Sequence, residues 1–167
     1  AKAAEFLKDG KQAVVIGGGV VGLEAAWELK KYQCDVTILE AMPSLMSNKL
    51  DSSASHMLQE IFEANGIRIL AGASTKKFED RKIYLEDGTV IPADLVVVSC
   101  GVRANSAIAA DAGVEIGRAI LVNDRMETNI PDLYAAGDCV EFEGMNYALW
   151  PEATDQGETA GANACGD

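Results

Sequence analysis

The sequence predicts an α/β fold in which helices pack against a parallel β-sheet. An apolar run at 11–16 ends in three glycines, a helical pattern follows at 20–32, and a second run rich in β-branched residues occupies 35–39. A strand, a helix and a strand joined by such short connections form a βαβ unit, in which the two strands lie parallel.

The composition limits the classes of partner. Apolar residues make up 49% of the 167, enough to form a core, and this argues against disorder. Acidic residues outnumber basic ones by 26 to 14, so the net charge of −12 argues against nucleic acid or an anionic membrane as a partner. A phosphate ligand remains compatible, because backbone N–H groups at a helix N-terminus bind phosphate without Lys or Arg.

Sequence features also bear on location. No apolar run reaches the roughly 20 residues of a membrane helix, and the first 11 residues lack the core of a signal peptide. The cysteines, Cys34, Cys100, Cys139 and Cys165, are scattered without metal-ligand spacing, so we expect a reduced cytoplasmic protein without a metal. Cys34 and Cys100 flank predicted strands and are expected to be buried thiols. Both ends look cut, which suggests a fragment of a longer chain.

The remaining elements follow in order along the chain. Asp51 is predicted to cap a helix at 52–64 that ends at Asn65-Gly66, with Ala54, Leu58, Ile61 and Phe62 facing the sheet. A third strand is predicted at 67–70, a small β-meander with an Asp87-Gly88 turn at 74–91, and a fully buried parallel strand at 94–99. Farther along we expect a helix at 105–112, strands at 120–122 and 133–136, and a helix at 152–164.

The glycine run has the spacing G-x-G-x-x-G between the first strand and the first helix. Gly17 allows the tight turn, Gly19 allows a pyrophosphate to approach the backbone, and Gly22 allows the helix to pack closely on the strand. The helix N-terminus at Val20 and Val21 then offers free N–H groups to phosphates. The architecture predicted is therefore a Rossmann-like three-layer domain with a parallel sheet, helices and a small β-meander.

Glu40 ends the second predicted strand, where such domains carry an acidic residue that accepts hydrogen bonds from the adenosine ribose. A carboxylate there would repel a 2′-phosphate, and neither Ala41 nor Met42 supplies a compensating positive charge, so NAD(H) is favoured over NADP(H). His56, the single histidine, lies in the 52–64 helix and is interpreted as a surface or packing residue. No residue is assigned a catalytic acid–base role.

Three stretches of the sequence resemble the FAD-dependent pyridine nucleotide–disulfide oxidoreductases, in particular the branches of NADH:rubredoxin reductase-like, nitrite reductase-associated and NADH oxidase-like enzymes. The first is Val-Val-Ile-Gly-Gly-Gly-Val-Val-Gly-Leu-Glu at 14–24. The second is 94–105, which contains Val-Ser-Cys-Gly-Val-Arg-Ala-Asn, and the third is Thr-Asn-Ile-Pro-Asp-Leu-Tyr-Ala-Ala-Gly-Asp-Cys-Val at 128–140. Ala104 stands where relatives often have Pro.

The resemblance implies two parts, an NAD(H)-binding domain at 1–120 and a C-terminal segment of an FAD-binding domain at 121–167. It implies that Asp138, on the Gly137 turn, binds the ribityl chain of FAD. Glu24 would lie near the nicotinamide and flavin, and the backbone of Gly101 would pass close to NAD. The reaction implied is hydride transfer from NADH to flavin and then to an unknown acceptor, which could be a small redox protein, in an enzyme that is a homodimer at full length.

Parts of the family pattern are missing from this sequence. An upstream glycine fingerprint for FAD, the redox-active cysteines and the interface domain are absent, so we expect the 167-residue chain alone to bind NAD(H), to lack stoichiometric FAD and to be inactive. Two alternatives stay open. One is a stand-alone NAD-binding or sensing module without catalysis, and the other is a structural α/β domain with a degenerate loop.

Overall fold

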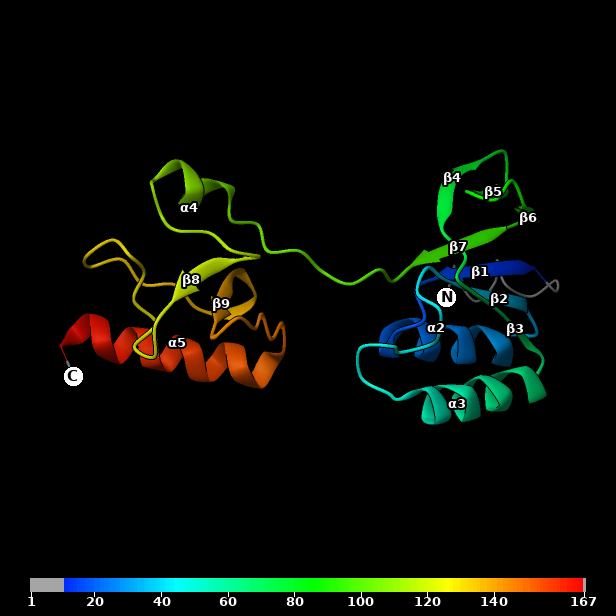
Figure 1. The fold of residues 1–167 in the computed structure, drawn as a ribbon, viewed down its shortest axis with the longest axis horizontal. Coiled ribbons are helices and arrows are strands. Elements are labelled where there is room, and N and C mark those ends of the chain that lie inside the picture. Colours follow the sequence, from blue (N-terminus) through cyan, green and yellow to red (C-terminus); the bar gives the residue numbers. More distant parts are fainter. Residues whose placement is uncertain (1–10, 167) are drawn as a thin grey trace. The chain divides into compact units, whose positions relative to one another are not determined.

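The computed structural model describes residues 11–166, which divide into two compact units (Figure 1). The first unit ends at Gly101 and the second begins at Val102. The sequence-based boundary between the two nucleotide-binding parts is at 120, whereas the boundary between the two compact units lies earlier, at Gly101. The assignment of each part to a cofactor stays a prediction.

A four-stranded parallel sheet forms the centre of the first unit. Its strands are β1 (Gln12–Ile16), β2 (Asp35–Glu40), β3 (Ile67–Ala71) and β7 (Leu95–Val98), in the order β3-β2-β1-β7. Ala13 of β1 pairs with Val36 on one side and with Leu95 on the other. Because all four strands run in the same direction, their carboxyl ends meet at one edge of the sheet.

Helices α2 (Val20–Lys31) and α3 (Ser52–Ala64) cover one face of this sheet (Figure 1). Leu23, Ala26 and Leu29 of α2 are buried, and Trp27 and Phe62 make an edge-to-face contact with ring centroids 5.4 Å apart. The prediction for Ile61 is wrong, since this side chain is 52% exposed. The helix turns a different residue inward, because Ser55 is buried and its hydroxyl donates to the carbonyl of Leu45 at 2.8 Å.

The caps of α3 are those that the sequence predicts. The carboxylate of Asp51 accepts a hydrogen bond from the N–H of Ala54 at 2.8 Å and so satisfies one of the free amides of the first turn. At the other end Asn65 follows the last helical residue, and Gly66 has a φ of +74°, a conformation that costs glycine little.

An antiparallel sheet covers the opposite face. Its strands are β4 (Thr75–Glu79), β5 (Lys82–Leu85) and β6 (Val90–Pro92), which confirms the predicted meander (Figure 1). Val14 packs on this side with Ile83 and Ile91, whereas Ala13 and Val15 pack on the helical side. Strand β1 is therefore buried on both faces, which is why its sequence is continuously apolar and does not alternate.

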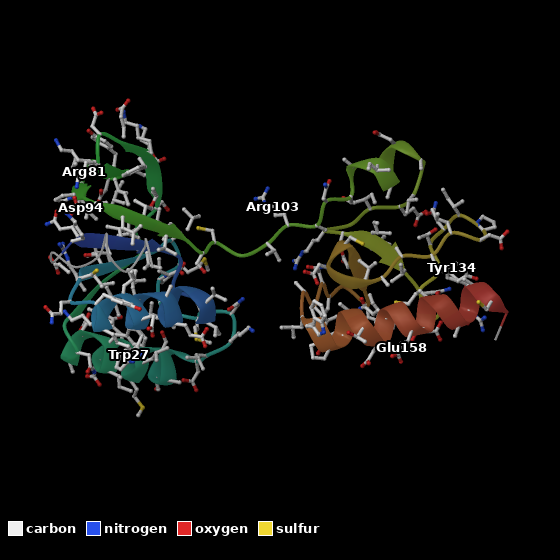
Figure 2. All side chains as sticks on the ribbon, turned by 180° about the vertical axis from the view of Figure 1, so that it is seen from behind. Trp27, Arg81, Asp94, Arg103, Tyr134 and Glu158 are labelled. Atoms are coloured by element: carbon white, nitrogen blue, oxygen red, sulfur yellow. The ribbon has the colours of Figure 1, made fainter. Side chains whose placement is uncertain are left out.

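Asp94 fastens the start of β7 to its neighbours. Its carboxylate accepts from the N–H of Gln12 at 2.9 Å and pairs with the guanidinium of Arg81, which lies beside it in Figure 2. The pKa of Asp94 is held below its ordinary value, and the Gln12 N–H has the largest effect. Burial opposes this with the next largest effect, and the Arg81 hydrogen bond, the Arg81 charge and the Lys11 charge add to the lowering.

The prediction that β7 is fully buried is wrong. Residues Leu95–Val97 are half-buried and Val98 is 69% exposed. The physical reason is position, because β7 is an edge strand that pairs only with β1 among the residues the structure describes. Apolar composition alone does not distinguish an edge from a centre.

The second unit contains α4 (Ala107–Asp111), β8 (Ile120–Val122), the 3₁₀ turn η1 (Gly137–Cys139), β9 (Val140–Phe142) and α5 (Trp150–Cys165). Strands β8 and β9 are parallel, with Ile120 opposite Val140, and both side chains are buried with Val114 in a small core. No helix within residues 11–166 is long and apolar enough to cross a membrane.

One strand prediction in the second unit is wrong. The segment 133–136 contributes only an isolated bridge between Tyr134 and Glu127, and the strand lies beyond the Gly-Asp turn at β9. The Tyr134 hydroxyl donates instead to the Asn163 carbonyl of α5 at 3.3 Å, so this segment packs against the helix (Figure 2).

Candidate nucleotide-binding site

A cleft of about 830 Å³ lies at the carboxyl ends of β1, β2 and β7. In open α/β sheets, ligands bind at this edge, in the crevice where neighbouring strands lead to opposite sides. Four of the sequence-predicted residues line the cleft, namely Gly17, Gly19, Glu40 and Gly101. The structure therefore brings the glycine loop and the predicted ribose acceptor together.

Gly17 makes the turn from β1 to α2 in a conformation that excludes a side chain. Its φ is +114°, and a Cβ at this position would lie 2.1 Å from the backbone oxygen of Ser99. The N–H of Gly17 donates to the carbonyl of Leu39 at 2.8 Å, and the N–H of Ser99 donates to Ile16 at 2.8 Å. The floor of the cleft is thus built from the ends of three strands in direct contact.

The other two glycines of the motif differ from each other in their surroundings. A Cβ on Gly22 would lie 2.0 Å from the oxygen of Gly17, so this residue is needed for the packing of helix on loop. A Cβ on Gly19 would meet nothing within 4 Å, and Gly19 is exposed as the N-cap of α2 without a capping side chain. The position that the motif assigns to pyrophosphate approach is open in the structure.

Glu40 ends β2 with a half-buried side chain that faces the glycine loop. Its Oε2 accepts from the N–H of Gly18 at 2.6 Å, and its Oε1 accepts from the N–H of Met42 at 2.7 Å. The carboxylate is therefore fixed at the edge of the cleft by two backbone donors.

The predicted residues of α2 are divided between surfaces. Val20 and Glu24 line an apolar depression between α2 and α3, together with Trp27 and Phe62, and not the cleft. Val21 is 67% exposed. The structure thus separates Glu24 from Glu40, and the proposed position of Glu24 beside nicotinamide stays a prediction.

Gly137 and Asp138 lie in the second unit. Gly137 has a φ of +83°, and its N–H donates to the side-chain oxygen of Gln156 on α5 at 2.8 Å. The Asp138 backbone oxygen accepts from the Asn146 amide at 2.8 Å. Its carboxylate is exposed and accepts no hydrogen bond from residues 11–166, so it is available to a hydroxyl group.

Other side chains with reactive chemistry have simple roles. Cys34 is buried, and burial raises the pKa of its thiol while the charge of Lys30 opposes this. Cys100 is exposed and lines the cleft, so the prediction that it is buried is wrong; it follows β7, whose end is open to solvent. His56 is exposed beside Glu60, as predicted for a surface residue. Residues 11–166 contain no cluster that could hold a metal.

The sequence reasoning missed several residues of the cleft. Gly18 is buried in the middle of the glycine loop, and the backbone of Ser99 lies against Gly17. Residues of the segments 41–48 and 73–75 form the side walls of the cleft. The run of three consecutive glycines was a signal for Gly18, because the motif itself requires only the first and third. The local sequence of the wall segments does not predict that they line a site, because they are loops whose positions depend on how the strands of the sheet are arranged.

The sequence match that decides the family extends over residues 1–157, and the family is described as pyridine nucleotide-disulphide oxidoreductase. The chain belongs to this family. It is 39% identical over 163 residues to the nitrite reductase [NAD(P)H] of Bacillus subtilis, covering 95% of this chain and 20% of that protein. It is 34% identical over 166 residues to the NADH-rubredoxin oxidoreductase of Clostridium acetobutylicum, covering 99% of this chain and 41% of that protein.

Solved structures of the pyridine nucleotide-disulphide oxidoreductase family share the fold. An NAD-dependent persulfide reductase from A. fulgidus superposes with a TM-score of 0.89 at 32% identity, over 99% of this chain and 33% of that one. The reductase in the covalent putidaredoxin reductase–putidaredoxin complex superposes with a TM-score of 0.85 at 30% identity, over 98% of this chain and 42% of that one. In each case this chain spans less than half of the relative.

Proposed function

We propose that the first part of the chain, residues 1–120, binds NAD(H) in the cleft at the carboxyl ends of β1, β2 and β7. The single observation that carries this proposal is the placement of Glu40 against the glycine loop at the edge of the cleft. The pyrophosphate would lie at Gly19 and the N-terminus of α2, and the adenosine ribose would lie at Glu40.

The residues present fit the dinucleotide. The backbone at Gly19 is open where a phosphate must approach, and the first turn of α2 has no side-chain cap competing for its amides. Glu40 carries a negative charge where a 2′-phosphate of NADP(H) would have to sit, and the neighbouring Ala41 and Met42 offer no cation. These features support a preference for NADH.

We also propose that this cleft serves an FAD-dependent oxidoreductase. When bound, the flavin supplies the chemistry by accepting a hydride from NADH and passing electrons on. This chain orients the nicotinamide through Gly101 and the glycine loop, and it offers the free carboxylate of Asp138 to the ribityl hydroxyls. A small redox protein is proposed as the acceptor, because relatives are named for rubredoxin and for a putidaredoxin complex.

Titration of the purified chain with NADH, followed by calorimetry or nucleotide fluorescence, tests the binding proposal. We expect saturable binding that is tighter for NADH than for NADPH, and the absence of saturation would end the proposal. A visible spectrum tests a separate expectation, that the isolated chain, which spans less than half of each relative compared, holds little flavin. Flavin bands at full occupancy would contradict that expectation.

A stand-alone sensing module is the other outcome of this test. It would bind NADH equally well, but it would have no use for Asp138. Addition of FAD to the chain and to an Asp138→Ala variant distinguishes the two functions, since weak flavin binding that depends on Asp138 supports the oxidoreductase. If the natural chain and Asp138→Ala bound FAD equally well, or if neither bound it at millimolar FAD, the sensing module would be favoured.

A further inference from the structure

The carboxylate of Glu40 connects two loops that line the cleft. Gly18, in the middle of the glycine loop, donates to Oε2 at 2.6 Å, and Met42, in the loop after β2, donates to Oε1 at 2.7 Å. Both distances are short, as expected when a backbone N–H donates to a charged acceptor. One side chain thereby holds the two loops at a fixed separation.

Packing around Gly18 strengthens this connection. Gly18 is buried, and a Cβ there would lie 3.0 Å from Oε2 of Glu40 and 2.7 Å from Cδ2 of Leu45. The Gly18 carbonyl also accepts from the N–H of Met46 at 3.1 Å. The absence of a side chain at the second glycine of the run therefore lets the carboxylate approach the loop.

The hydrogen bonds to the loops leave room for a ligand. An ionised carboxylate has about four lone-pair positions, and the two backbone donors occupy one on each oxygen. The two positions that remain match the two hydroxyl donors of an adenosine ribose. Holding the loops and binding the ribose therefore do not compete for the same acceptor sites.

We infer that Glu40 is a positioning residue for the glycine loop, holding it in its phosphate-binding conformation before the nucleotide arrives; this rests on the proposed NAD(H) site and deepens it. A cationic residue at position 40 would accommodate a 2′-phosphate but would release the N–H groups of Gly18 and Met42. Cofactor preference and the shape of the pyrophosphate site are thus coupled through one side chain.

A ligand without ribose hydroxyls separates the two roles of Glu40. Binding of ADP and of 2′,3′-dideoxy-ADP is measured by calorimetry on the natural chain and on Glu40→Ala. If Glu40 holds the loop, dideoxy-ADP binds Glu40→Ala at least about fivefold more weakly than it binds the natural chain, the size of effect expected from losing charge-assisted hydrogen bonds. Equal affinity of dideoxy-ADP for the two proteins would overturn the inference.

Amide hydrogen exchange, read by NMR without nucleotide, gives an independent measure. We expect the N–H groups of Gly18 and Met42 to exchange slowly in the natural chain, because both are hydrogen-bonded to Glu40, and at least about tenfold faster in Glu40→Ala. Glu28→Ala is the matched control, because Glu28 is exposed on α2 and pairs with Lys31 outside the cleft. Unchanged exchange in Glu40→Ala would refute the positioning role.

These two measurements also separate this inference from the proposed function. If the natural chain bound neither ADP nor NADH, the proposed function would fail, while the exchange rates would still decide whether Glu40 holds the loop. If Glu40→Ala did not fold, Glu40→Gln would replace it. Its side chain has the same size, but its NH₂ group must face one of the two backbone N–H groups, so the same exchange result is expected at Gly18 or Met42.

Discussion

Gly17 and Gly19 belong to the same motif, but the structure predicts that replacing them by alanine has opposite consequences. At Gly17 an alanine would have to adopt a φ of +114°, and its Cβ would lie 2.1 Å from the oxygen and 2.7 Å from the carbon of the Ser99 backbone. At Gly19 the φ is −83°, and a new Cβ would meet no other part of the described structure within 4 Å, apart from its immediate neighbours in the chain. One change therefore strains the fold, and the other alters only the surface that faces a ligand.

The magnitude for Gly17→Ala has two sources. A non-glycine residue held in such a conformation costs about 1–3 kcal/mol, and overpacking against backbone that cannot move aside costs a further ~1–3 kcal/mol. The reduced freedom of the unfolded chain offsets less than about 1 kcal/mol. We therefore expect the free energy of unfolding of the first unit to fall by about 3 kcal/mol, which for a unit of roughly 100 residues lowers Tm by about 10 °C or more.

Thermal and urea unfolding followed by circular dichroism measure this effect, and NADH titration completes the comparison. Gly19→Ala should keep its Tm within about 2 °C of the natural chain and bind NADH at least about tenfold more weakly, because a methyl group occupies the approach of the pyrophosphate. A Gly17→Ala variant as stable as the natural chain, or a Gly19→Ala variant with unchanged NADH affinity, would refute this account of the loop.

Three further predictions concern charge and reactivity. Glu40→Arg should raise the ratio of NADPH to NADH affinity while lowering the NADH affinity by about tenfold or more, as competition titrations would show; an unmoved ratio would remove Glu40 from the ribose site. The depressed pKa of Asp94 means that its contacts with Gln12 stabilise the fold above the ordinary value of 3.8 and lose this effect as the pH falls below it. Asp94→Asn should therefore be less stable than the natural chain in urea at pH 7 but match it near pH 2, and an equal deficit at both pH values would contradict this. With a thiol reagent, exposed Cys100 should react in the folded chain and be protected by NADH, whereas Cys34 should react only on unfolding; rapid labelling of Cys34 would show that its burial is wrong.

The elements that the sequence predicted correctly have local causes. The cap at Asp51, the left-handed Gly66 and the hairpin turn of the meander each depend on a few adjacent residues, so they can be read without knowledge of the fold. The βαβ unit is equally local, because its two strands are separated by a single helix. Its geometry then places Glu40 beside the glycine loop.

The features that the sequence did not predict depend on distant pairing. The contact of Gly17 with Ser99 exists because β7 pairs with β1, and nothing near either residue signals this neighbour. The exposure of Val98 and Cys100 follows from the edge position of β7, although their apolar setting resembles that of a central strand. In the second unit, the local sequence pattern predicts a strand at 133–136, before the Gly-Asp turn. The strand that forms is β9, after that turn, because Val140 pairs with the distant Ile120.

The pairing of β1 with β7 also has a consequence for how the chain acquires its fold. Gln12 and Asp94, which join the two strands at their start, are 82 residues apart in sequence. Contacts of such long range close late and slow folding, since the loop entropy must be overcome before the contact stabilises anything. During synthesis, the βαβ unit can therefore form before β7 has been synthesised. The wall of the cleft at Ser99 is completed only when β7, the last strand of the parallel sheet, has been added.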